Sequence, residues 1–150
     1  MITLAVLLGT YVVLALFKVE KKLRGKIALA VLLVFTGTAH FYKTPEMMNM
    51  LPDLIKFKRE IIYITGVFEI LGAIGILIPR INRIAGICLI IMFICFLPAN
   101  IYAALHHVDF GGHKYGPGYL LFRVPLQLFF IWWTFRYAVR ASRKEYIKGR

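Results

Sequence analysis

The sequence predicts an all-α, polytopic membrane helix bundle, with a four-helix core and one further N-terminal helix, in a single domain over residues 1–150. Hydrophobic residues make up 60% of the chain and the mean hydropathy is +0.73, well above the values of ordinary soluble domains. The charged residues are few and gather in blocks. The long apolar stretches between these blocks are typical of membrane spans.

Five apolar segments are the predicted spans. They cover about residues 2–17, 27–41, 61–78, 84–105 and 119–138. At a rise of about 1.5 Å per residue, segments of about 15 to 22 residues suit a hydrocarbon core of roughly 30 Å. The first segment is short, and an interfacial or hairpin helix is its alternative interpretation.

The charge of the connecting segments predicts the topology. Residues 18–26 carry five positive charges and one negative, residues 79–83 carry two positive charges, and the tail from Arg136 carries six against Glu145. The two other connections, residues 43–60 and 106–118, are nearly balanced. Because positive segments stay in the cytoplasm, we expect the N-terminus outside and the C-terminus inside, in the cytoplasmic membrane if the cell is bacterial.

Other features are consistent with this topology. Tyr119 is expected at the outer end of the last span, and Trp132, Trp133 and Tyr137 at its inner interface. The outer connection, residues 43–60, is too apolar for free coil, so part of it is expected to form a short helix. The net charge of +12 indicates contact with anionic lipid rather than with nucleic acid, because the basic residues flank apolar runs.

Cysteine and histidine residues give no catalytic or metal motif. Cys88 and Cys95 lie seven residues apart in one predicted helix, about 10 Å along its axis, too far for a mutual disulfide. We interpret them as small packing residues. Three histidines and Asp109 fall within residues 106–113, but their spacing matches no strong metal motif. This connection, with four glycines up to Gly118, is predicted to be a solvated hairpin without a metal.

The candidate site consists of polar residues inside the predicted spans, where ionisable groups cost several kcal/mol on insertion scales (about 3 each). They are His40, Glu69, Asn100, Arg123 and Gln127, with Thr36 and Thr65 as lesser members. Counting about 1.5 Å per residue from the outer ends places all five in the outer half of the bilayer, on four helices. The sequence therefore predicts one polar pocket that opens outward.

Spacing within the helices supports the pocket. Arg123 and Gln127 are four residues apart and share a face. Gly66, Glu69 and Ala73 share a stripe of small residues, where another helix can approach. Prolines lie two residues from Asn100 and from Arg123, and a proline in a span frees a backbone carbonyl and bends the helix.

Three interpretations of these residues stay open at this stage. Glu69 and Arg123 would form a buried ion pair that fixes the helix register. The same groups would bind a ligand. Glu69 and His40 would act as acid and base in an enzyme.

Several stretches resemble a known family when taken in order. They are Gly37–Phe41, Thr65–Gly72, Ile78–Arg80 with Arg83 and Ala85, Pro98–Ala103, and Arg123–Gln127 with Trp132 and Trp133. Over residues 27–137 the chain resembles the DoxX-like family of small membrane proteins. The resemblance implies a four-helix membrane core, to which residues 2–17 are an addition.

What the resemblance implies about function is twofold. Members of the family are associated with thiosulfate–quinone oxidoreductase and other membrane redox complexes, and a eukaryotic branch assists the assembly of ligand-gated channels. We therefore expect a quinone- or lipid-like ligand, or an accessory role in a redox complex, with no catalytic residue of its own. Arg123 and Gln127 would hold the polar head, Glu69 would be a proton-linked partner and His40 would gate or hydrogen-bond.

The alternative is a non-catalytic assembly factor that binds a partner membrane protein or a second copy of the chain. The chain departs from the redox relatives because it has no paired cysteines, which argues against direct thiol chemistry.

Overall fold

The computed structural model describes residues 2–140, which form helices with no strand among them, so the all-α prediction is confirmed. The helices are α1 (Ile2–Leu16), α2 (Lys21–Tyr42), α3 (Thr44–Met48), α4 (Lys58–Gly75), α5 (Asn82–Leu105), the 3₁₀ helix η1 (His113–Tyr119), α6 (Leu120–Thr134) and the π-helical turn η2 (Phe135–Val139).

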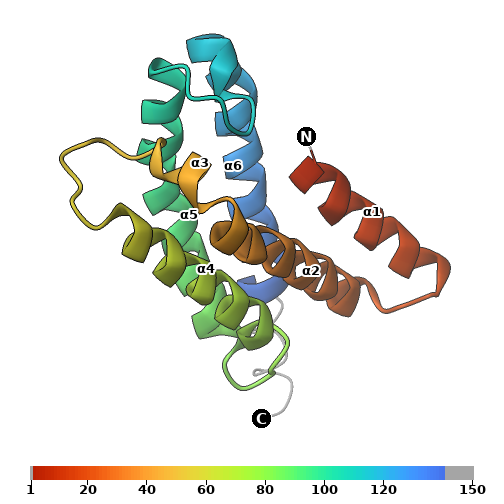
Figure 1. Ribbon diagram of the computed structural model, residues 1–150. Coiled ribbons are helices and arrows are strands. Elements are labelled where there is room, and N and C mark those ends of the chain that lie inside the picture. Colours follow the sequence, from red (N-terminus) through yellow and green to blue (C-terminus); the bar gives the residue numbers. More distant parts are fainter. Residues whose placement is uncertain (1, 141–150) are drawn as a thin grey trace.

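The long helices run back and forth between two ends of the molecule. Figure 1 shows α3 and η1 in the upper part of the bundle and the α4–α5 connection in the lower part. We call the first the η1 end and the second, which also holds η2 and the start of α2, the η2 end. Gly25 near the start of α2 faces the ring of Tyr137 in η2. This contact places the start of α2 beside η2.

Two of these helices could cross a membrane on the criteria of length and apolar composition. They are α2, with 22 residues, and α5, with 24 residues. α1 is apolar but has only 15 residues.

The helix bounds differ from the expected spans where charged residues or glycines lie at the ends. α2 begins at Lys21 rather than at residue 27, because lysine and arginine are good helix formers and continue the helix beyond its apolar part. α4 ends at Gly75, four residues before Pro79, which cannot continue a helix. The short helix expected in the outer connection is α3, with Pro45 in its first turn.

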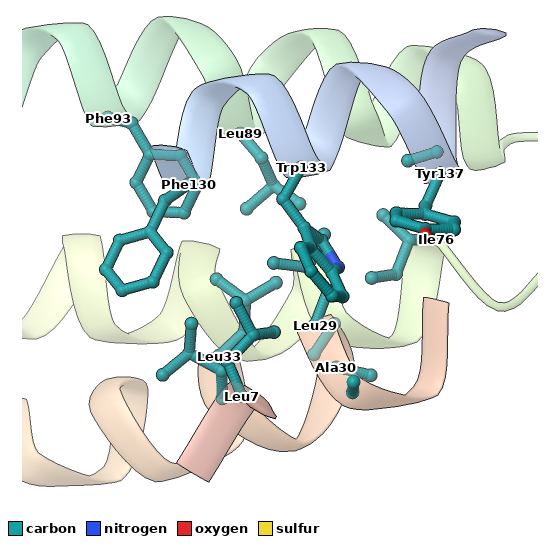
Figure 2. Close-up of a cluster of buried hydrophobic side chains, with 14 of the residues drawn as sticks. Leu7, Leu29, Ala30, Leu33, Ile76, Leu89, Phe93, Phe130, Trp133 and Tyr137 are labelled. Atoms are coloured by element: carbon teal, nitrogen blue, oxygen red, sulfur yellow. The ribbon is translucent and has the colours of Figure 1, made fainter. Parts of the chain in front are cut away.

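The core is a layer of apolar side chains shared by all the long helices. Figure 2 shows Leu7, Leu29 and Leu33 on one side of it and Leu89, Phe93 and Phe130 on the other. Close packing of such side chains supplies dispersion contacts, which stabilise helix contacts whether water or lipid surrounds the bundle.

Two of the aromatic residues expected at the inner membrane interface belong to this core. Trp133 is 5% exposed and Tyr137 is buried, whereas Trp132 is 52% exposed. Trp133 and Tyr137 therefore pack inside the bundle, at the end of the last helix where they were expected, and their depth in a membrane stays a prediction. Trp133 satisfies its indole N–H by donating to the carbonyl oxygen of Gly25 (3.1 Å), so it needs no interface water.

A cluster of aromatic side chains joins α1 to the bundle. The Tyr11 ring meets the Trp133 ring edge-on, with centroids 5.1 Å apart, and the hydroxyls of Tyr11 and Tyr137 lie 3.3 Å apart. Arg24 donates to the Tyr11 hydroxyl (3.2 Å) and lies 4.3 Å above its ring. We call Tyr11, Arg24, Trp133 and Tyr137 the aromatic cluster; sequence reasoning did not predict it.

Candidate functional site

The site begins with the close contact between α2 and α4. A Cβ atom on Gly37 would lie 3.0 Å from the carbonyl oxygen of Gly66, and one on Gly66 would lie 2.7 Å from the Cβ of His40. Only glycine at these two positions lets the helices approach so closely. The contact brings His40 of α2 against the stripe of α4 that carries Thr65 and Glu69, as expected from the small residues beside Glu69.

His40 is held by α4 through one of its ring nitrogens. Its Nδ1 lies 2.9 Å from the carbonyl oxygen of Ile62 and 3.1 Å from the hydroxyl of Thr65. Because a carbonyl oxygen only accepts, Nδ1 carries a proton and donates it. The other nitrogen, Nε2, faces the Glu69 carboxylate at 3.8 Å. This separation is longer than a hydrogen bond, so the two groups face each other without a direct bond.

Glu69 is a buried carboxyl group with an unsatisfied oxygen. The residue is 3% exposed, and its Oε2 has no hydrogen-bond partner. Thr36, one turn before His40, directs its hydroxyl to the carbonyl oxygens of Leu32 and Leu33 in its own helix. Leaving a buried polar atom without a partner costs about 1–3 kcal/mol, so this carboxyl group needs an explanation.

Asn100 is the centre of a second group of polar residues. Its Oδ1 accepts from Arg123 Nε at 2.9 Å, and its Nδ2 donates to the carbonyl oxygen of Phe96 at 2.7 Å. These two bonds fix the orientation of the amide. Arg123 therefore lies on Asn100, and the direct Glu69–Arg123 ion pair that the sequence left open is not formed, although the two charges still interact at longer range.

His113 belongs to this second group, and sequence reasoning missed it. It is 2% exposed, and its Nδ1 donates to the carbonyl oxygen of Phe110 (2.6 Å) while its Nε2 lies 3.2 Å from Asn100 Oδ1. Burial, with a smaller contribution from Arg123, lowers the pKa of His113 below its ordinary value of 6.5. The neutral ring then directs its Nε2 lone pair at an oxygen, and protonation would turn this contact into a hydrogen bond.

The three histidines expected in a solvated connection have different partners. His106 stacks on Tyr102 with ring centroids 3.9 Å apart, and His107 bonds the carbonyl oxygen of Lys114. The solvated prediction was wrong for His113, because the turn that contains Gly111 and Gly112, both with positive φ, folds it back onto α5. Within residues 2–140 no group of three His, Cys, Asp or Glu residues is arranged to hold a metal ion.

Gln127 and Phe96 complete the site. Gln127 is buried and donates from Nε2 to the carbonyl oxygen of Phe93 (2.7 Å) in α5. The ring of Phe96 lies 6.1 Å from that of His40, and its carbonyl oxygen accepts from Asn100. We call His40, Glu69, Asn100, Arg123 and Gln127, with His113, the polar cluster.

The polar cluster joins four helices and has two groups of direct contacts. His40 and Glu69 form one group, and Asn100 and Arg123 form the other. A shallow apolar groove lies elsewhere, between α1 and α6. A ligand pocket at the polar cluster stays a prediction.

Comparison of the chain with curated proteins and with solved structures gives no match. A family model described as "Domain of unknown function (DUF8561)" matches residues 29–138. The match begins within α2 and ends in η2, so it contains every residue of the polar cluster and excludes α1. The chain belongs to the DUF8561 family.

Proposed function

We propose that the protein is a polytopic membrane protein with five spans, with its N-terminus outside and its C-terminus in the cytoplasm. The apolar outer faces of its helices support this. Large hydrophobic side chains are exposed along α4 and α5, at Ile64, Val67, Phe68, Leu71, Ile74, Ile84, Ile87, Ile91 and Ile94. Monomers in water rarely expose apolar patches larger than a few hundred Å² (about 300–600), whereas lipid would cover such faces without cost.

The distribution of charge supports the orientation. Lys18 and Lys21 lie at the α1–α2 connection, Arg80 and Arg83 at the α4–α5 connection, and Arg136 in η2. These connections are all at the η2 end, so this end would face the cytoplasm. The η1 end holds the nearly balanced connections and would face outward.

Within this bundle we propose that the polar cluster binds a small apolar molecule with a polar head, of quinone- or lipid-like type. The observation that carries this proposal is the unsatisfied Oε2 of buried Glu69. A protonated carboxyl there would donate to a carbonyl oxygen of such a head, and Arg123, whose terminal nitrogens are not used by Asn100, would donate to a second one. The similarity to DoxX-like proteins adds the proposal that the chain serves as an accessory subunit of a membrane redox complex.

A second candidate function is non-catalytic assembly of a partner membrane protein. The observation that favours it is the hydrogen bonding of Asn100, His113 and Gln127 to neighbouring backbone carbonyls, which leaves these residues little capacity for a ligand. In this case the exposed faces of α4 and α5 would contact the partner, and Glu69 would be a structural residue.

Native mass spectrometry of the purified protein in mild detergent tests the two candidates. The variants are Glu69→Gln and, as its matched control, Glu60→Gln, which changes an exposed carboxylate of the same helix. We expect a co-purifying small-molecule mass in the wild type and in Glu60→Gln, and its loss in Glu69→Gln. A bound mass that persists in Glu69→Gln would contradict the role of Glu69, and a stoichiometric protein partner without a small-molecule mass would favour the assembly function.

A further inference from the structure

Basic side chains at the η2 end surround the two tyrosine hydroxyls of the aromatic cluster. Arg24 donates to the Tyr11 hydroxyl (3.2 Å), and its guanidinium carbon lies 4.3 Å from the centre of that ring. Lys21 also acts on Tyr11 electrostatically, and the guanidinium carbon of Arg136 lies 6.0 Å from the centre of the Tyr137 ring. We call Lys21, Arg24 and Arg136 the basic group. Its charges, from α2 and η2, converge on two neutral hydroxyls.

The basic group has no acidic partner within residues 2–140. The ion pairs between residues of this part of the chain are His40–Glu69, Lys43–Glu46, Lys58–Asp53 and Lys114–Asp109. Glu20, the acid nearest to Lys21 and Arg24 in sequence, is exposed and belongs to none of these pairs. Positive charges that lack a counter-charge attract an anion from outside the chain.

The hydrogen bonds of the aromatic cluster leave more donors than acceptors. A guanidinium only donates, and Nε of Arg24 has no partner. The hydroxyls of Tyr11 and Tyr137 lie 3.3 Å apart, so one donates to the other, and one hydroxyl proton is left without an acceptor in the described part of the chain. An anion with several oxygen atoms beside the hydroxyls would accept from this proton and from the guanidinium.

The surroundings of the basic group indicate which anion fits. Large apolar side chains of the same segments are exposed, at Leu16, Phe17, Leu23 and Phe135. An inorganic phosphate ion would leave these side chains uncovered, whereas a phospholipid would cover them with its acyl chains. A phosphate group also suits an arginine, because guanidinium and phosphate pair through parallel hydrogen bonds.

We propose that the basic group, together with the Tyr11 and Tyr137 hydroxyls, binds the phosphate of an anionic phospholipid in the cytoplasmic leaflet. This inference rests on the membrane placement proposed above, in which the η2 end faces the cytoplasm, and not on a ligand at the polar cluster. Arg24 lies in the first turn of α2, and Tyr11 lies about 8 Å from the end of α1, so long side chains reach the headgroup region from there. The bound phosphate would connect α1 with α2 and η2.

Native mass spectrometry of the full-length protein in mild detergent, titrated with lipid, tests the inference. Dioleoyl phosphatidylglycerol is the anionic probe, and phosphatidylcholine with the same acyl chains is the comparison without net charge. Inorganic phosphate is the soluble anion. We expect phosphatidylglycerol to bind about fivefold more tightly than phosphatidylcholine, and a large excess of inorganic phosphate to leave it bound.

Arg24→Gln removes the central charge of the basic group. Arg80→Gln is its matched control, because Arg80 is an exposed arginine at the same end of the bundle but outside the basic group. The affinity for phosphatidylglycerol should fall about fivefold in Arg24→Gln and less than about twofold in Arg80→Gln. If Arg24→Gln fails to fold, Lys21→Gln, at the exposed first residue of α2, gives the same test with an expected loss of about threefold.

Three results would overturn the inference. They are equal losses of affinity in Arg24→Gln and Arg80→Gln, equal binding of the two lipids, and displacement of phosphatidylglycerol by inorganic phosphate. Release of the protein from membranes by alkaline carbonate would overturn the membrane placement as well. A protein that stays embedded but loses affinity equally in both variants would overturn the phosphate site alone.

Discussion

At the η2 end of the bundle, buried contacts are made by large rings, with Trp133 and Tyr137 packed against Tyr11 and Gly25. At the η1 end, buried contacts are made by polar side chains, with Glu69 facing His40 and Asn100 holding Arg123. Each end has one charged group with an unsatisfied atom, Arg24 Nε and Glu69 Oε2. The arginine has a tyrosine ring 4.3 Å from its guanidinium carbon, whereas the glutamate has His40 and the hydroxyl of Thr36 as its polar neighbours.

This difference separates a part of the core that tolerates imprecise geometry from a part that does not. Rings fill space and need a partner only for one N–H or O–H group, so the aromatic cluster stabilises the bundle with few directional constraints. In the polar cluster every polar atom needs a hydrogen-bond partner, and the cluster adds little stability when one partner is missing. Substitutions made separately in the aromatic cluster and in the polar cluster test this difference.

The largest effect is expected at the η2 end, for Trp133→Ala. It removes a buried ring and the indole N–H that binds Gly25, and should lower the free energy of unfolding by about 3 kcal/mol. Trp132→Ala is the matched control and should cost under about 1 kcal/mol, because Trp132 is exposed. Thermal unfolding in detergent micelles measures both. Equal losses for the two tryptophans would show that the aromatic cluster does not hold α1 and α6 to α2.

The next effect is expected where α2 meets α4. Gly66→Ala places a methyl group 2.7 Å from the Cβ of His40, so the helices must separate, at a cost of about 2 kcal/mol. His40 should then move away from Glu69. Gly118→Ala, which has no atom within 4 Å of the added Cβ, should leave stability within about 0.5 kcal/mol of the wild type. Stability of Gly66→Ala at the wild-type level would contradict the close α2–α4 contact.

A smaller effect, of opposite sign, is expected for Glu69→Gln. The substitution removes a buried ionisable group without changing its shape, and should raise the free energy of unfolding by about 1 kcal/mol. Glu60→Gln, on the exposed face of the same helix, should change it by less than about 0.5 kcal/mol. Chemical denaturation of the purified variants measures the difference. A clear loss of stability in Glu69→Gln would mean that the His40–Glu69 contact holds the bundle together and has a structural role.

The smallest effect concerns pH at the η1 end. The pKa of His113 is lowered in the folded protein by burial, so the unfolded chain binds its proton more readily. Stability should therefore be full above the ordinary value of 6.5 and should fall as the pH drops below it. Tm measured from about pH 7.5 to about pH 5.5 should show a decrease smaller than the effect of any substitution above. His113→Asn should remove this part of the decrease, and an unchanged pH profile in this variant would exclude His113 as its source.

The fold was predictable from the sequence because apolar periodicity and helix-ending residues act locally. The segments around α4 and α5 were placed within a few residues, and the stripe of Gly66, Glu69 and Ala73 was correctly predicted to be buried. Estimated depth put all five polar residues in one set but did not pair them, and the Glu69–Arg123 pair that the sequence left open is not formed.

The positions of His113, Trp133 and Tyr137 could not be predicted in this way. His113 lies in a glycine-rich connection whose course depends on three glycines with positive φ, a conformation that a residue pattern does not reveal. The two aromatic residues fit an interfacial belt as well as a core, and only the contact with Tyr11 and Gly25 distinguishes the two. That contact spans over 100 residues of the chain.

The sequence by itself determined that the chain is helical, which of its faces are apolar, and which polar residues share a depth, because these properties depend on residues a few positions apart. Only the tertiary structure decided which of those polar residues meet. Helix rotation and the Gly37–Gly66 approach put His40, not Arg123, beside Glu69. Partner choice depends on the orientation of whole helices, and this is set by packing over the entire core.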